Sequence, residues 1–133
     1  MIERAEMMEP MLSACPSFRS TWDEFVAEWK DREQGLPYYL VLSDLVRHLV
    51  AMLERRDTAQ FDAIFDVVER WHTEGDPYVR AAATIGLLED LQNTNFYTIA
   101  SPTDFKPYLR EQSTRWWDKV ERFWATGEAI RDH

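Results

Sequence analysis

The fold is decided by residues 76–93, which read DPYVRAAATIGLLEDLQN. Asp76 is a residue type that caps helices and Pro77 suits the first helical position, so a helix is predicted to start there and to run to the end of the segment. The segment has almost no polar side before Glu89, and a helix that is apolar all round is typical of the centre of a domain. Gly86 costs such a helix about 1 kcal/mol relative to alanine, so we expect a close crossing with another helix at that point.

The flanking sequence predicts further helices, because apolar residues recur at helical spacing between Pro and Gly breaks. No stretch alternates apolar and polar residues as a strand requires. We therefore predict an all-α fold, a compact array of about six antiparallel helices in a single domain over residues 1–133. The other predicted elements are a short helix or turn between Pro10 and Pro16, helices from Thr21 (in capping-box spacing with Glu24) to Gly35, Pro37 to Glu54, Asp57 to Gly75 and Ser113 to Ala129, a loop from Asn93 to Thr103, and a short helix from Asp104 to Leu109.

Composition restricts both the location and the partners. The chain holds 24 Asp and Glu against 15 Lys and Arg, a formal net charge of −9. An acidic surface repels nucleic acid and anionic membrane, so neither is an expected partner. A single cysteine excludes an internal disulfide, the first residues do not form a secretory signal, and no apolar run reaches the roughly 20 residues of a membrane span. The expected location is the cytoplasm.

The start of the central segment resembles a known repeat. Asp76, Pro77, Val79 and Arg80, with three alanines behind them, are similar to the second helix of a HEAT repeat, in which Asp caps the helix and Arg reaches an acid of the neighbouring repeat. The resemblance implies a HEAT-like pair of helices over residues 58–93. A solenoid normally needs about three such units, and only one good match is present, so an ordinary capped core helix is the other interpretation.

A longer stretch, residues 79–93, is similar to a helix of small uncharacterised bacterial all-helical proteins of the immunity-protein type. Such proteins are cytoplasmic antidotes that bind and block a toxin. Residues 105–110 and the pair Trp116 and Trp117 give a weaker likeness. The resemblance implies a non-enzymatic protein-binding domain, not an enzyme, with a toxin as its partner and no cofactor. A HEAT-like scaffold or regulatory adaptor is the alternative.

Acidic residues are concentrated in one helix. Residues 57–76 contain six acids and one base, and Asp62, Asp66 and Glu69 line one stripe at spacings i, i+4 and i+7. We predict that these three residues bind the partner, since an acidic stripe attracts a toxin with a basic active-site cleft. Residues 93–101 are the second candidate contact.

Two other interpretations of the acidic residues stay open, a solvated helix face that aids solubility and a mimic of DNA. A second acidic run also precedes the central segment. It consists of Asp23, Glu24, Glu28, Asp31 and Glu33.

The enzyme alternative depends on histidines. Glu69 and His72 have the Glu-x-x-His spacing of di-iron helical bundles, and Asp44 with His48 is the only partner pair. Carboxylate and imidazole together bind Zn²⁺ or Fe²⁺. A histidine near a helix end is favourable without any metal, so our prediction is no metal, with these four residues as the alternative site. The third histidine, His133, is expected to be mobile.

Other signals of catalysis or nucleic-acid binding are weak. Cys15 lacks a histidine close in sequence, and no Gly-rich phosphate loop or hydrolase motif is present, so no catalytic residue is predicted. Tryptophans beside basic residues would allow base stacking, but those of the last helix lie on the arc expected for the core. That predicted core face is Trp116, Trp117, Val120, Phe123 and Trp124.

Overall fold

The computed structural model describes residues 1–131, so His133 lies outside the described part of the chain. The predicted all-α class is confirmed: residues 1–131 contain no strand, and their one β-type contact is an isolated bridge between Ile2 and Gly75. Four short 3₁₀ helices and one π-helix, η3, accompany the α-helices. The elements are η1 (Arg4–Glu6), α1 (Met8–Ala14), η2 (Pro16–Phe18), α2 (Arg19–Trp29), α3 (Tyr38–Glu54), α4 (Phe61–Glu74), α5 (Pro77–Ala81), η3 (Ala82–Leu88), α6 (Glu89–Leu91), η4 (Thr94–Phe96), η5 (Pro102–Tyr108) and α7 (Glu111–Thr126).

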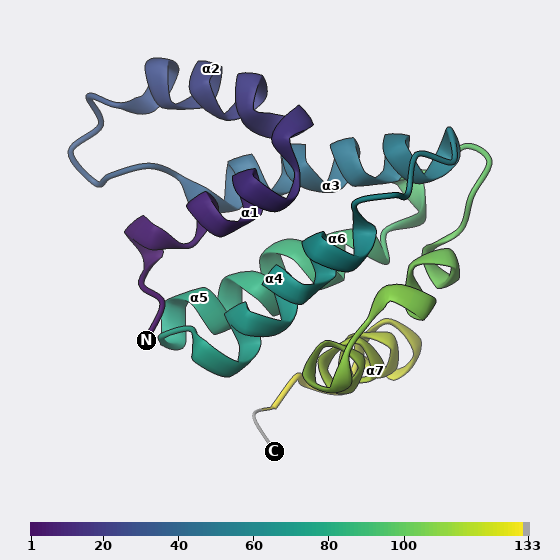
Figure 1. The fold of residues 1–133 in the computed structure, drawn as a ribbon. Coiled ribbons are helices and arrows are strands. Elements are labelled where there is room, and N and C mark those ends of the chain that lie inside the picture. The colour runs from purple at the N-terminus through teal and green to yellow at the C-terminus, as the bar shows by residue number, and fades with distance from the viewer. Residues whose placement is uncertain (132–133) are drawn as a thin grey trace.

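The helix predicted from the central segment is present as α5, η3 and α6 in direct succession (Figure 1). Asp76 caps it, because a side-chain oxygen of Asp76 accepts the N–H of Val79 at 2.9 Å, and Pro77 occupies the first turn. Every residue of η3 except Ile85 is buried. The element packs against α3, α4 and α7, which confirms its predicted central position.

The middle of this segment is a π-helix, so the prediction of a regular α-helix there is wrong. The N–H of Glu89 donates to the carbonyl of Thr84, five residues earlier, where an α-helix would bond four residues back. The close crossing at Gly86 is confirmed: a Cβ atom on this glycine would lie 2.8 Å from the Leu42 side chain and 3.1 Å from Tyr39. Both contacts belong to α3, which identifies the crossing helix.

Several helix ends differ from the predictions, among them the end of α2 at Trp29 instead of Gly35 and the start of α4 at Phe61 instead of Asp57. Helix α1 begins at Met8, so Pro10 lies within its first turn, where the missing N–H of proline costs nothing. Helix α2 follows η2 directly, so Thr21 stands inside the helix and makes no cap. Helix α7 ends before Gly127, whose φ of 75° places it in the left-handed region that glycine favours.

One hydrophobic cluster extends through all the longer helices and contains Trp71, whose indole N–H donates to the carbonyl of Met7 at 3.0 Å. The predicted core face of α7 is partly wrong. On this face, the side chains of Trp117 and Val120 are buried, but the side chain of Trp124 is 54% exposed. No helix within residues 1–131 combines the length and the apolar character needed to cross a membrane.

The beginning of the chain is joined to the corner between α4 and α5. The N–H of Ile2 donates to the carbonyl of Glu74 at 2.6 Å, and the carbonyl of Ile2 accepts the N–H of Asp76 at 2.8 Å. Gly75 stands between these two hydrogen bonds. The corner is therefore held on both sides by backbone contacts.

We predict that Gly75→Ala lowers the free energy of unfolding by about 1–3 kcal/mol, the usual cost of an extra methyl group in packed surroundings. The added Cβ would lie 2.3 Å from the carbonyl oxygen of Trp71 and 2.7 Å from the Val79 side chain. Urea unfolding followed by tryptophan fluorescence measures the change. Gly35→Asn is the control, because nothing lies within 4 Å of a Cβ there and asparagine tolerates the positive φ. Equal stability of Gly75→Ala and the parent chain would contradict this account.

Candidate protein-binding surface

The predicted acidic stripe on α4 is divided between solvent and helix α7. Asp62 and Asp66 are exposed. The guanidinium of Arg110 donates to the backbone carbonyl of Asp62 at 3.0 Å and lies 3.9 Å from its carboxylate, which is 82% exposed. A surface pair of this kind contributes little to stability, so the Asp62 carboxylate remains accessible to a partner.

Glu69, the third residue of the stripe, caps α7 from the neighbouring helix. Its two carboxylate oxygens accept the backbone N–H groups of Gln112 and Ser113, each at 2.8 Å. The first N–H groups of a helix have no acceptor within the helix, and they carry its positive dipole end. The half-buried carboxylate of Glu69 is therefore engaged within the fold, and only Asp62 and Asp66 of the predicted set face solvent.

The four residues of the alternative metal site are not brought together. Within residues 1–131, no group of three or more His, Cys, Asp or Glu side chains is placed to hold a metal ion. His48 on α3 bonds through Nε2 to the hydroxyl of Ser17 at 2.8 Å. Asp44 pairs with Arg47 at 3.3 Å on the same helix.

His72 is a buried hydrogen-bonding residue. Its Nδ1 lies 3.0 Å from the carbonyl of Val68, which can only accept, so Nδ1 carries the hydrogen. Burial lowers the pKa of His72, and the ring is neutral near pH 7. Its Nε2 then accepts the hydroxyl hydrogen of Thr84 at 3.2 Å, which connects α4 to the π-helix.

The second acidic run, on α2 and just after it, is the more accessible one. All five of its residues are exposed, and none of them forms an ion pair with another part of the described chain. Two of them, Glu24 and Glu28, line a groove between α2 and α3 with a volume of about 390 Å³. The groove is lined by Thr21, Glu24, Phe25, Glu28, Trp29, Leu40, Ser43, Asp44 and Arg47.

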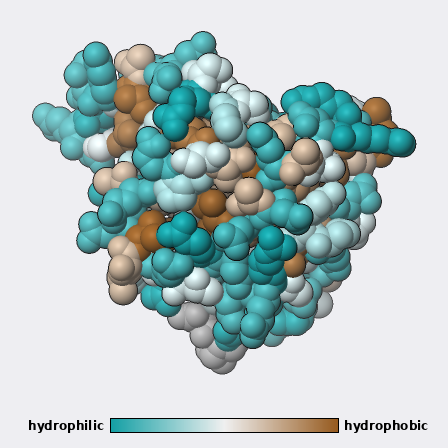
Figure 2. Space-filling model, in the orientation of Figure 1, coloured by the Kyte–Doolittle hydropathy of each residue, from teal (hydrophilic) through white to brown (hydrophobic). Residues whose placement is uncertain are grey.

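The lining of this α2–α3 groove combines polar residues with three apolar ones, Phe25, Trp29 and Leu40. Leu40 is 52% exposed, and the partly buried Trp29 and the buried Phe25 lie beside it. The one basic residue of the lining, Arg47, is already paired with Asp44. On the face seen in Figure 2, hydrophilic residues cover most of the surface and hydrophobic residues form small patches between them. Three apolar side chains beside the unpaired carboxylates of Glu24 and Glu28 match a partner with both apolar and cationic groups.

The loop after α6, the second predicted contact, is held by one side chain. The carboxylate of Glu54 at the end of α3 accepts the N–H groups of Thr98, Ile99 and Ala100 at 2.8, 2.6 and 3.0 Å and the hydroxyl of Thr98 at 3.0 Å. Figure 1 shows this loop reaching from α6 to the end of α3. The Ile99 side chain, 85% exposed, projects from the loop.

Sequence reasoning missed the α2–α3 groove and the role of Glu54. A signal for the groove was present, because α2 carries Phe25 and Trp29 in alternation with Glu24 and Glu28, which joins apolar and acidic groups on one helix. Glu54 had no signal, since its partners lie 44 to 46 residues away.

We predict that Glu69→Ala lowers the free energy of unfolding by about 1–2 kcal/mol, the usual effect of removing a helix cap. Asp66→Ala on the same helix, which removes an exposed carboxylate, is the matched control and should stay within about 0.5 kcal/mol of the parent chain. Chemical denaturation measures both. Equal effects of the two variants would show that Glu69 does not support α7.

A second prediction concerns pH. The three N–H groups of the loop lower the pKa of Glu54 from 4.5 to about 2. The stabilisation that Glu54 gives the loop is therefore complete above pH 4.5 and is lost as pH falls through about 2. The NMR amide signals of residues 98–100 should stay in place down to about pH 4 and move only below it. Glu54→Gln is the control, because it should shift these signals already at neutral pH. A transition centred on pH 4.5 would contradict the prediction.

The comparison with known proteins adds a family but no function. No curated protein and no solved structure matches the chain. One family model, described as a domain of unknown function (DUF7674), matches residues 8–125. That range begins at the first residue of α1 and ends one residue before the end of α7. The chain therefore belongs to the DUF7674 family.

Proposed function

We propose that this chain is a non-enzymatic protein-binding domain that holds a cationic partner in the α2–α3 groove. The observation that carries the proposal is the exposure of Glu24 and Glu28, without ion pairs in residues 1–131, beside the apolar side chains of Trp29 and Leu40. Carboxylates in this position steer a basic partner toward the groove and raise the rate of association. The partly exposed side chains of Trp29 and Leu40 then supply apolar area to be buried, which slows dissociation.

The role that we assign to this binding is that of an immunity-type antidote. Residues 79–93 resemble proteins of that type, and such an antidote acts by occlusion, with a preformed acidic surface covering a basic active-site cleft of a toxin. A stable interface covers about 800 Å² on each partner, which is more than the groove alone. The partner would therefore also contact the rest of α2 and the residues that follow it. The pair Asp62 and Asp66 on α4 is the second surface to be tested.

The test is charge reversal, with affinity measured against the toxin encoded next to this gene. Glu24→Lys and Glu28→Lys should each weaken binding about tenfold or more, mainly by slowing association and most strongly at low salt. Asp118→Lys is the matched control, because Asp118 is exposed on α7 and makes no ion pair in the described chain. It changes the net charge equally and should leave affinity nearly unchanged.

The other outcomes are equally informative. Loss of affinity only on reversal of Asp62 and Asp66 would overturn the groove and assign the interface to α4. Equal effects of all reversals, including Asp118→Lys, would indicate net charge alone. Absence of binding by the parent chain would overturn the antidote role for that toxin.

A further inference from the structure

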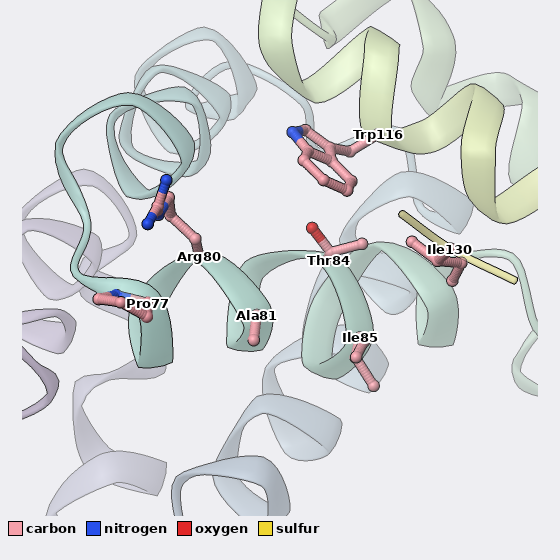
Figure 3. A pocket seen from close by; sticks show the side chains of 7 residues that line it. All are labelled: Pro77, Arg80, Ala81, Thr84, Ile85, Trp116 and Ile130. Carbon is pink, nitrogen blue, oxygen red and sulfur yellow. The ribbon is translucent and has the colours of Figure 1, made fainter. Parts of the chain in front are cut away.

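A cavity of about 260 Å³ lies between the central helix and α7, away from the α2–α3 groove. Arg80 and Thr84 project into it from the central helix, Trp116 faces them from α7, and Ile130 comes from the segment after α7 (Figure 3). The volume is slightly below the roughly 300 Å³ at which pockets for drug-sized ligands begin, so a small metabolite is the appropriate size of ligand. The remaining lining residues are Pro77, Ala81 and Ile85.

The cavity has an apolar side. Ala81, Ile85 and Ile130 contribute aliphatic groups, and Trp116 contributes an aromatic ring. Ile85 is 48% exposed and is the only residue of the π-helix that is not buried. An exposed isoleucine in an otherwise buried element is consistent with a surface that a ligand covers, because covering it removes apolar area from water.

Arg80 supplies a free cationic group at the edge of the cavity. Its side chain makes no ion pair or hydrogen bond with any residue of the range 1–131. A guanidinium offers several N–H donors in a fixed plane, which suits a carboxylate bound through both oxygens. Thr84 cannot take this role, because its hydroxyl hydrogen is donated to His72 and the oxygen is left as an acceptor. The anionic end of a ligand is therefore directed to Arg80.

Two further basic side chains lie near the ring of Trp116. The guanidinium of Arg115 lies 5.6 Å and the Nζ of Lys119 lies 4.4 Å from the centre of the Trp116 ring. Lys119 also donates to the backbone carbonyl of Arg131. The Arg115 guanidinium thus adds positive charge beside Trp116, which favours an anion over a neutral or cationic ligand.

The backbone on the central-helix side of the cavity is unusual as well. Thr84 and Ile85 belong to the π-helix, a conformation that is rare and occurs frequently at functional sites. We propose that the cavity binds a small organic acid, with its carboxylate on Arg80 and its apolar group between Trp116 and Ile85. This is a second binding site, independent of the partner surface proposed above.

The test uses 3-phenylpropionate as the probe and two-dimensional NMR of the full chain as the readout. Binding should shift the indole N–H of Trp116 and the amide of Ile85 and leave residues of the α2–α3 groove in place. Arg80→Gln should weaken binding about tenfold or more, which corresponds to the loss of a charge-assisted hydrogen bond. Arg19→Gln is the matched control, because Arg19 pairs with Glu9 at 3.4 Å far from the cavity lining. Its affinity should be unchanged.

Two further probes separate the carboxylate from the apolar group. The amide 3-phenylpropionamide, which lacks the charge, should bind the parent chain no better than 3-phenylpropionate binds Arg80→Gln. Acetate, which lacks the apolar group, should bind at least tenfold more weakly than 3-phenylpropionate. The proposal is overturned by absence of any shift up to about 10 mM probe, by shifts confined to another surface, or by equal affinity of Arg80→Gln and the parent chain.

Discussion

The close packing of α3 side chains on Gly86 of the central helix is the contact on which the rest of the structure depends. Here the central helix crosses α3 so tightly that a Cβ atom would lie 2.8 Å from Leu42. Packing against α3 at this crossing, together with α4 and α7 on the other sides, buries every residue of η3 except Ile85. Because α3, α4 and α7 all pack against the central helix, this small domain forms a single hydrophobic cluster without a sheet.

Carboxylates hold the elements that surround this centre. Asp76 caps the central helix, Glu69 caps α7 from α4, and Glu54 accepts three successive N–H groups of the loop after α6. Each satisfies backbone donors that would otherwise lack a partner. The net charge of −9 is therefore not a measure of the acidic surface that a partner meets, because part of it serves the fold. For this reason the candidate interface is the second acidic run, on α2 and just after it, and not the stripe on α4. The acids of this run are exposed and unpaired within the described chain.

The helices could be predicted from the sequence because their positions depend on signals that lie close together along the chain. Caps, breakers and apolar spacing identified the longer helices, and the sequence Asp76-Pro77 identified the start of the central one. The π-helix could not be predicted, since the spacing of apolar residues does not distinguish hydrogen bonds five residues back from those four residues back. The exposure of Trp124 could not be predicted either, because helical spacing shows which residues share one side of a helix but not how much of that side is buried. The role of Glu69 as a cap of α7 could not be predicted, because a carboxylate on a helix stripe looks the same in sequence whether it faces solvent or a neighbouring helix end.

The loop bound by Glu54 has a consequence for the thermodynamics of recognition. A loop residue that must be ordered on binding subtracts about 1–2 kcal/mol of conformational entropy from the interaction. Residues 98–100 are fixed before any partner arrives, since each donates its N–H to the same carboxylate. A partner that covers Ile99 therefore meets an apolar side chain on an ordered backbone, and the free energy of burying that side chain is retained as affinity.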